Sequence, residues 1–215
     1  MNDENKNILV IINSKSGKGK SFEVYNKFIK NYLEKEDYIL NEIYSKFDGH
    51  FSKYITENKE TIYFMKFIVV LGGDGTLHYI INDLMNIEKK IPIVIIPTGS
   101  GNGLFKTITF ENDDVYNVHQ SEKILDRCKI KNCDLIEVNN GLRKFYSFLA
   151  ISWGFISDVD LKTEFLRRLG SFRFDLGALW FLLMKKSYYG KFSYEKSKNQ
   201  TIEIEGNFIH FWACN

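Results

Sequence analysis

The stretch Phe67-Ile68-Val69-Val70-Leu71-Gly72-Gly73-Asp74-Gly75-Thr76 runs from apolar residues straight into a glycine-rich turn. Beyond it, apolar side chains recur at the spacing of one helix face, at Leu77, Ile80, Ile81, Leu84 and Met85. A buried strand, a tight turn and an amphipathic helix therefore follow one another. Glycine has no Cβ, so the N–H groups of such a turn can approach an anion, and the helix start adds unpaired donors. This order is typical of a phosphate-binding turn in an α/β protein.

Two more segments repeat this arrangement. Residues 91–96 run into Pro97-Thr98-Gly99-Ser100-Gly101-Asn102-Gly103, and residues 8–12 run into Asn13-Ser14-Lys15-Ser16-Gly17-Lys18-Gly19-Lys20-Ser21. The last three residues resemble the end of a P-loop, but that motif requires glycine at position 14, which is serine here. No GxGxxG fingerprint occurs either. The lysines of the first turn either bind phosphate or are solvated cations of a surface turn.

Asp74 is the acidic residue at the mouth of the central turn. A carboxylate among phosphate-binding amides would repel the substrate unless it served as a general base or as a metal ligand. The alternative is a turn aspartate that accepts hydrogen bonds from nearby N–H groups. The repetition of glycine turns favours the catalytic interpretation.

Residues 8–21 and the two later glycine turns together resemble the catalytic domain of the diacylglycerol and sphingosine kinase superfamily. A second segment, Ser152 to Leu161 continued by Arg167 to Phe174 and Leu176-Gly177, closely resembles the substrate-binding stretch of eukaryotic sphingosine kinases. The resemblance implies an ATP-dependent lipid kinase that phosphorylates the primary hydroxyl of a sphingoid base. A diacylglycerol or other lipid kinase is the alternative within the enzyme class. A relative of NAD kinase or phosphofructokinase shares only the Gly-Gly-Asp-Gly turn.

The resemblance also implies roles for individual residues. Asp74 would be the catalytic base, and Asp160 would recognise the amine of the lipid head group. Gly72, Gly73 and Gly75 would line the transfer site on the substrate side. ATP, with Mg²⁺, would be held by twelve residues, and no side chain is assigned as a metal ligand: Asn13, Ser14, Lys15, Gly17, Lys18, Ser45, Gly49, Gly99, Ser100, Gly101, Arg167 and Arg173. Apart from the resemblance, Arg167, Arg168 and Glu164 would be a solvated helix face with i,i+3 and i,i+4 pairs.

The sequence departs from the family in three places. Tyr79 follows His78 where sphingosine kinases usually have a glutamate near the nucleotide, and Gly103 replaces an alanine. The family also has a late acidic Gly-Asp-Gly-Glu-type motif, and none occurs after Asp74. These differences leave open a catalytically impaired fragment that binds nucleotide or lipid.

The fold class that we expect is α/β, with a three-layer nucleotide-binding domain followed by the start of a mainly β domain. Residues 1–130 would form the kinase domain of the diacylglycerol kinase and NAD kinase type, with strands near 8–12, 39–44, 67–71 and 92–96. Residues 131–215 would form part of a β-rich lipid-binding domain that the chain does not complete. We expect an unpaired hydrophobic edge there, which makes a homo-oligomer a candidate assembly.

Composition narrows the partners. Lys and Arg number 29 and Asp and Glu number 27, a balance that argues against nucleic acid. The acidic, polar start predicts no secretory leader, and the three cysteines have no CxxC pairing. The apolar run from Phe174 to Met184 is too short to span a bilayer, and is either a lipid-tail pocket or ordinary core. We expect a cytoplasmic protein that associates peripherally with membranes, where it meets its sphingoid lipid substrate.

Overall fold

The computed structural model describes residues 5–110, 122–127, 129–163, 165–166, 172–184, 186–197 and 200–215. The chain divides into two compact units, residues 1–148 and 149–215. The functional division near residue 130 stays a prediction, since it concerns which residues serve nucleotide and which serve lipid. Each unit is described by itself.

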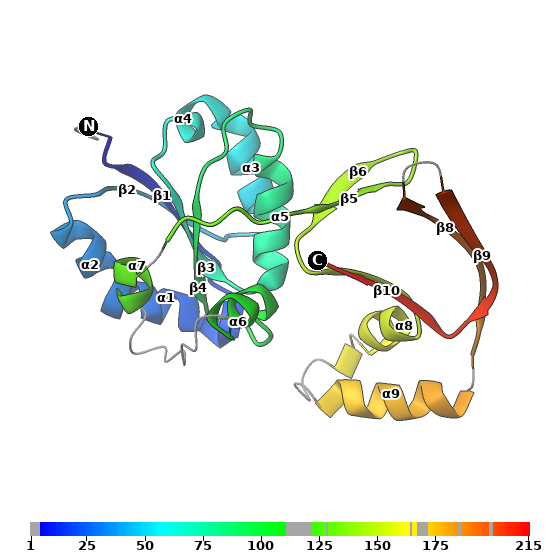
Figure 1. Ribbon diagram of the computed structural model, residues 1–215. Helices are drawn as coiled ribbons and strands as arrows, with labels where there is room; N and C mark the ends of the chain where they lie inside the picture. The colour runs from blue at the N-terminus through cyan, green and yellow to red at the C-terminus, as the bar shows by residue number, and fades with distance from the viewer. Residues whose placement is uncertain are drawn as a thin grey trace. The chain divides into compact units, whose positions relative to one another are not determined.

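The first unit is built on a parallel sheet of four strands, in the order β2-β1-β3-β4 (Figure 1). The strands are β1 (Asn7–Ile12), β2 (Ile39–Tyr44), β3 (Ile68–Gly72) and β4 (Ile93–Pro97). In the register, Leu9 of β1 lies opposite Asn41 of β2 and Ile68 of β3, and Ile68 lies opposite Ile93 of β4. All four strands lie where the sequence predicted them, and the α/β fold class is confirmed.

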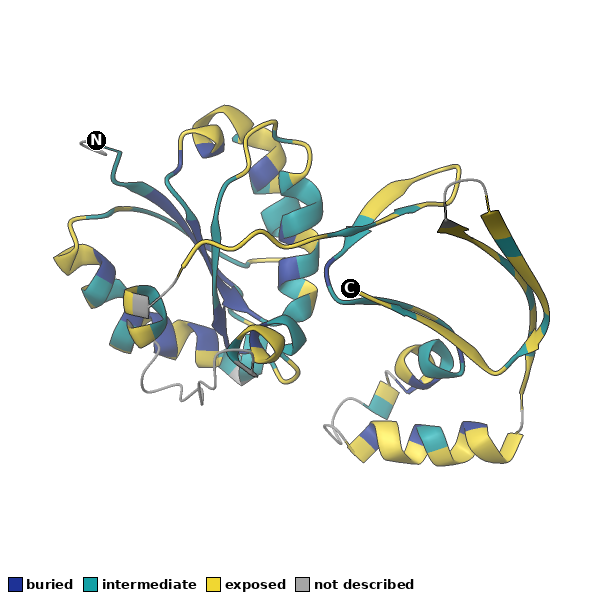
Figure 2. Cartoon of the chain, in the orientation of Figure 1, coloured by how far each residue is buried: buried dark blue, intermediate teal, exposed yellow. Residues whose placement is uncertain are grey.

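Helices cover both faces of this sheet, because the central strands are apolar on both faces. On one face lie α1 (Lys20–Val24), the π-helical turn η2 (Tyr25–Ile29), α2 (Lys30–Lys35) and α7 (Glu122–Arg127), packed over Ile8, Val10 and Ile12. On the other face lie α3 (His50–Glu57), α4 (Lys59–Tyr63) and α5 (Asp74–Leu84), packed over Leu9 and Ile11. Figure 2 shows the central strands β1 and β3 as the dark, buried centre of the unit, and the outer strands are less buried.

Three short elements complete the first unit. The 3₁₀-helix η1 (Ser16–Gly19) forms the turn after β1, and α6 (Gly103–Phe110) follows the turn after β4. The hairpin of β5 (Ile136–Asn139) and β6 (Lys144–Ser147) pairs antiparallel, with Glu137 opposite Tyr146.

In its described residues, the second unit contains two antiparallel strand pairs and the helices α8 (Phe155–Lys162) and α9 (Phe172–Met184). Strand β7 (Ala150–Gly154) pairs with β10 (His210–Cys214), and β8 (Tyr188–Ser197) pairs with β9 (Gln200–Phe208). Helices α8 and α9 follow β7. Because each sheet has two strands, every strand of this unit has one edge without a β partner among the described residues.

The apolar run predicted from Phe174 to Met184 forms most of α9, and it is mostly exposed. Of this helix, Arg173, Gly177 and Phe181 are buried, whereas Trp180 is 64% exposed and Leu183 is 72% exposed. Figure 2 shows α9 mostly in the colour of exposed residues. Ordinary core therefore does not describe this helix. In the part of the chain that the structure describes, no helix has the length and apolarity needed to cross a membrane.

Candidate functional site

The predicted site residues of the first unit gather at the carboxyl edge of the sheet. Asn13 follows β1, Ser45 follows β2, Gly73 follows β3 and Thr98 follows β4. The strand order reverses between β1 and β3, which makes this the topological switch point of the sheet. In open α/β sheets, ligands bind at this crevice outside the carboxyl ends of the strands.

Two glycine turns pack backbone against backbone at this edge. A Cβ built on Gly99 would lie 2.6 Å from the Cα of Gly73, and one built on Gly73 would lie 3.2 Å from the Cα of Gly99. The Thr98 N–H also donates to the Gly72 carbonyl at 3.1 Å. The turns that follow β3 and β4 therefore form one continuous surface of main chain, with no room for a side chain where they touch.

Asp74 begins α5 and reaches across to the next turn. Its Oδ2 accepts a hydrogen bond from the Gly103 N–H at 2.8 Å, and its Oδ1 lies 3.3 Å from the Leu104 N–H. These amides open α6, so the carboxylate caps the N-terminus of that helix, where the dipole favours negative charge. A Cβ on Gly101 would lie 3.3 Å from Oδ2 of Asp74. The carboxylate is thus held among the amides of the predicted phosphate-binding turn.

Asn102 shapes this turn, and sequence reasoning missed it. Its backbone is left-handed, with φ of 54°, a conformation that asparagine adopts more readily than most residues. Its side chain accepts from the Gly99 N–H at 3.1 Å and donates to the Gly99 carbonyl at 2.7 Å. An asparagine between two glycines is the signal in the sequence that could have identified it.

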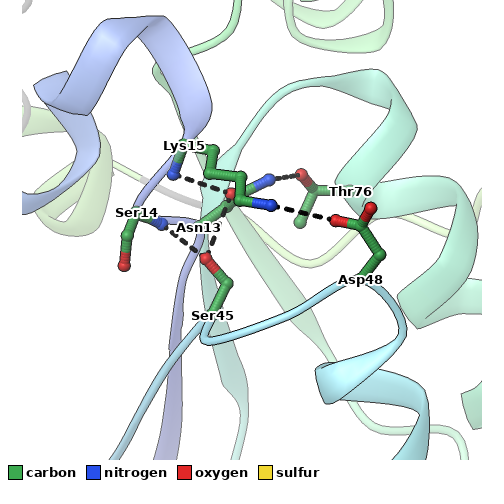
Figure 3. Close-up of polar contacts among 6 residues, drawn as sticks. All are labelled: Asn13, Ser14, Lys15, Ser45, Asp48 and Thr76. Atoms are coloured by element: carbon green, nitrogen blue, oxygen red, sulfur yellow. Dashed lines mark hydrogen bonds and ion pairs between the residues drawn. The ribbon is translucent and has the colours of Figure 1, made fainter.

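A hydrogen-bonded cluster joins the turn after β1 to the start of α5 and to the segment after β2 (Figure 3). The Asn13 amide donates to Oγ1 of Thr76 at 2.6 Å, which links β1 to the first turn of α5. The Ser14 N–H donates to Oγ of Ser45 at 2.9 Å, and the Lys15 N–H donates to Oδ1 of Asn13 at 3.1 Å. Four residues predicted to bind ATP therefore form hydrogen bonds among themselves: Asn13 with Lys15, and Ser14 with Ser45.

Lys15 carries the exposed cation of this cluster. Its Nζ lies 3.1 Å from Oδ1 of Asp48, and the two side chains are 68% and 99% exposed. A pair this exposed is worth little to stability, so an incoming phosphate could replace the aspartate at small cost. Neither Asp48 nor Thr76 was singled out from the sequence.

The first turn also contacts the turn after β4. Gly17 has φ of 58°, and a Cβ there would lie 2.2 Å from the Thr98 carbonyl oxygen. The buried hydroxyls of Ser21 and Thr98 lie 2.6 Å apart. The backbone of Lys18 lies in η1, and its side chain falls outside the described part.

The remaining predicted glycines of the first unit lie in or beside these turns. Gly49 precedes α3 with φ of 83°. Gly72 ends β3, where a Cβ would lie 2.8 Å from the Thr76 Cβ, whereas a Cβ on Gly75 would meet no atom within 4 Å. Ser100 is exposed in the turn after β4.

Asp160 and Arg173 belong to the second unit and contact each other. Arg173 Nη2 lies 3.0 Å from Oδ1 of Asp160, and Nη1 lies 3.4 Å from the carbonyl oxygen of Thr163. The arginine side chain is 9% exposed, and that of the aspartate is 61% exposed. The residue predicted to read the lipid amine is therefore paired with one predicted to bind ATP. Arg167 lies outside the described residues.

A cluster of charged and polar side chains around Asp158 of α8 was not predicted from the sequence. Asp158 Oδ2 accepts hydrogen bonds from Nζ of Lys162 at 2.7 Å, Nζ of Lys186 at 3.2 Å and the hydroxyl of Tyr188 at 2.5 Å. Burial acts to raise the pKa of Asp158, but these three hydrogen bonds outweigh it and lower that pKa to about 2. This cluster ties α8 to the start of β8.

Protein ligands for a metal are few. Among the described residues, no three His, Cys, Asp or Glu side chains lie close enough together to hold an ion. Asp74 is the carboxylate that lies within the glycine turns. Mg²⁺ in phosphoryl-transfer sites is commonly held by one or two carboxylates together with substrate phosphates, and this donor set fits that pattern.

A family model and several curated proteins match this chain. The family model for the diacylglycerol kinase catalytic domain matches residues 7–138. Sphingosine kinase 1 of Mus musculus is 30% identical over 203 residues, which cover 87% of this chain and 51% of that protein. Sphingoid long chain base kinase 5 of Saccharomyces cerevisiae is 31% identical over 207 residues, covering 91% of this chain and 30% of the relative. The chain thus spans about half the length, or less, of these curated relatives.

Solved structures show the same fold. The crystal structure of a diacylglycerol kinase from Bacillus anthracis superposes with a TM-score of 0.63 at 22% identity, covering 96% of this chain and 63% of that one. The matched family region contains all three glycine turns, Asp74 and the whole four-stranded sheet. This chain therefore belongs to the diacylglycerol kinase catalytic domain family.

Proposed function

We propose that this chain is the catalytic part of an ATP-dependent lipid kinase that phosphorylates the primary hydroxyl of a sphingoid base. The observation that carries the proposal is the convergence of three glycine turns around Asp74 at the switch point of the sheet. The similarity to sphingosine kinases supports the choice of lipid, because it covers more of the chain than the first unit alone.

The chemistry that we infer uses Asp74 as a general base. The lipid hydroxyl oxygen attacks the γ-phosphorus of ATP, the bond from that phosphorus to the bridging oxygen breaks, and ADP leaves. The hydroxyl proton passes to the Asp74 carboxylate. A carboxylate has about four acceptor positions, so two amide hydrogen bonds from α6 leave room for this proton. The same amides fix the position of the carboxylate.

Nucleotide binding in this proposal rests on main-chain amides. The glycine turns after β3 and β4 would face the phosphates, and Lys15 would turn from Asp48 toward them. Most catalysis of phosphoryl transfer comes from positioning and charge neutralisation, which suits such a site. Mg²⁺, when bound with ATP, would neutralise phosphate charge. Asp74 is the carboxylate in the glycine turns that would help to hold the ion.

Selection of the lipid is assigned to Asp160. One carboxylate oxygen accepts from Arg173, and the side chain is still 61% exposed, so acceptor positions remain for a protonated amine. A neutral diglyceride has no cation to bind there. Because Arg173 is buried beside this carboxylate, we infer that it serves Asp160 more than the ATP phosphates.

The exposed apolar side of α9 is the candidate surface for the lipid tail and for a peripheral membrane contact. Leu179, Trp180 and Leu183 are all more than half exposed on this helix. Exposed apolar patches commonly mark ligand or membrane contacts. This surface would bring the protein to the bilayer in which its substrate is dissolved.

The test is phosphate transfer from labelled ATP to sphingosine and to diacylglycerol in mixed micelles, with wild type beside Asp74→Asn. Asparagine retains one acceptor oxygen for α6 but takes up no proton, so we expect transfer to sphingosine to fall by about 10²–10⁴-fold. Circular dichroism of both proteins is the control for folding. Equal transfer by the variant would refute the role of Asp74.

The same assay separates the alternatives. Preference for diacylglycerol would replace the sphingoid base with a neutral lipid. ATP binding without transfer to either lipid would identify a chain that binds nucleotide without catalysis, consistent with Tyr79.

A further inference from the structure

Asn82 lies on the third turn of α5. Its side-chain amide forms the two hydrogen bonds with β6 that the main chain of a neighbouring strand would form. Its Oδ1 accepts from the Tyr146 N–H at 2.7 Å, and its Nδ2 donates to the Tyr146 carbonyl at 2.9 Å. Nδ2 also donates to the His78 carbonyl at 2.8 Å, within its own helix. One side-chain amide therefore satisfies both backbone groups of a residue in β6.

This contact holds one edge of the β5–β6 hairpin. Tyr146 lies opposite Glu137 of β5, and both main-chain groups of Tyr146 bond to Asn82. Backbone groups that are removed from water need such partners, so the hairpin depends on α5 for this edge. The hydroxyl of Tyr146 donates to Glu137 at 3.2 Å, which stabilises the hairpin internally but does not fix it to the helix.

The position of Asn82 joins two functional parts of the chain. Asp74 opens α5, and Asn82 lies two turns further along the same helix. Strand β6 ends at Ser147, and the second unit begins at Leu149. The first unit thus ends two residues after Tyr146, the residue that Asn82 holds.

We propose that Asn82 is a positioning residue for phosphoryl transfer, because it fixes the exit of the chain toward the lipid-binding unit on the helix that carries Asp74. This inference rests on the proposed function. It predicts a role in bringing lipid to the base and none in binding ATP, since Asn82 makes its contacts with α5 and β6 and not with the glycine turns.

Only a primary amide of this length can make both bonds. Aspartate is isosteric but replaces the donor with an oxygen that faces the Tyr146 carbonyl, and alanine leaves both backbone groups without this partner. Asn86 offers a matched control one turn along. Its amide lies 3.3 Å from the Asn82 carbonyl oxygen and 3.4 Å from that of Asp83, both within the helical region.

The experiment compares wild type, Asn82→Asp, Asn82→Ala and Asn86→Ala in the full 215-residue chain. Lipid phosphorylation gives kcat, calorimetry with a non-hydrolysable ATP analogue gives Kd, and hydrogen exchange follows the amide of Tyr146. For both Asn82 variants we expect kcat to fall at least tenfold, the Kd for the analogue to stay within about twofold, and exchange at Tyr146 to accelerate, since small misplacements cost large factors in rate. Asn86→Ala should match wild type in all three.

Parallel loss of analogue binding and of transfer would overturn the proposal, because it would mean a general loss of structure. Unchanged transfer in both Asn82 variants would overturn it as well. If wild type itself phosphorylated no lipid, the proposed function would fail. Hydrogen exchange would still test whether Asn82 holds the main chain of Tyr146, and unchanged exchange at Tyr146 in Asn82→Asp would refute that contact.

Discussion

The two units of this chain are stabilised in different ways. In the first, apolar side chains pack against both faces of a parallel sheet, and Ile11 and Ile80 are completely buried. In the second, α9 exposes most of its apolar residues, while ion pairs and hydrogen bonds gather around Asp158 and Asp160. The first unit is therefore held by a buried apolar core, whereas the second unit leaves an apolar helix surface exposed.

The largest contrast should come from truncating one apolar side chain in each unit. Ile11→Ala removes a fully buried side chain from the centre of the sheet, and we expect it to lower the free energy of unfolding by about 2–5 kcal/mol. Trp180→Ala removes a side chain that is 64% exposed, so the expected cost is within about 0.5 kcal/mol.

Urea unfolding of both variants, followed by far-ultraviolet circular dichroism, measures this difference. A cost for Trp180→Ala as large as that for Ile11→Ala would show that α9 is packed as core, and the contrast between the units would then be wrong.

Two glycines test the same contrast at the level of backbone packing. A Cβ on Gly99 would lie 2.6 Å from the Cα of Gly73, whereas one on Gly177 of α9 would lie 2.5 Å from a methyl group, the Cγ2 of Thr163. Main chain cannot move aside, so we expect Gly99→Ala to cost about 1–3 kcal/mol and to weaken ATP binding. Gly177→Ala should cost less, because alanine gains about 1 kcal/mol of helix propensity.

Thermal unfolding and calorimetry with ATP measure these two effects. Equal destabilisation by both glycine variants would indicate that the glycine turns yield as easily as a helix contact. Gly75→Ala, at the start of α5 and with no atom within 4 Å of the added Cβ, is the control for a glycine substitution that meets no neighbour.

The roles proposed for residues of the two units predict which Michaelis constant, that for ATP or that for the lipid, each substitution changes. Asp160→Asn removes the charge that would bind the lipid amine, and we expect KM for sphingosine to rise about tenfold, the loss of one charge-assisted hydrogen bond. Arg173→Lys should also raise KM for sphingosine and leave KM for ATP within about twofold, because Arg173 is paired with Asp160.

Steady-state kinetics with each substrate varied in turn distinguishes the roles of these residues. If Arg173→Lys raised KM for ATP alone, Arg173 would be assigned to ATP binding, as the resemblance to sphingosine kinases implied. Lys15→Ala in the first unit is the reference, since it should raise KM for ATP and not KM for the lipid.

The last contrast concerns the acid stability of the second unit. The folded pKa of Asp158 is about 2 and the ordinary value is 3.8, so its ionised form favours folding. This contribution is present above pH 4 and is lost as the pH falls from about 4 through 2.

We therefore expect wild type to be more stable than Asp158→Asn at pH 6 and the two proteins to converge as the pH approaches 2. Chemical unfolding at a series of pH values measures the difference. A difference that does not depend on pH would mean that the carboxylate acts through its shape and not through its charge.

Much of the fold could be predicted because it follows from local patterns. The run of apolar residues before each glycine turn gave strands β1, β3 and β4, and the spacing from Leu77 to Leu84 gave α5. The candidate site at Asp74 could be predicted for a similar reason, since glycines are required by the conformation and close packing of the turns themselves. The roles of individual residues stay predictions.

Long-range partners could not be predicted in this way. Nothing local marks Asn13 as the partner of Thr76, or Asn82 as the partner of Tyr146, because each pair is brought together from more than sixty positions apart. The pairing of Asp160 with Arg173 and the exposure of α9 likewise depend on how helices pack.

The sequence by itself determined the elements of this protein and its family, because hydrophobic period and glycine turns act over a few residues at a time. Only the tertiary structure decided that Gly73 touches Gly99, that Asp74 caps α6, and that one asparagine holds the strand through which the chain leaves the first unit. The physical reason is that these contacts join segments far apart along the chain, and the order of strands in the sheet, which no short pattern encodes, decides which segments meet.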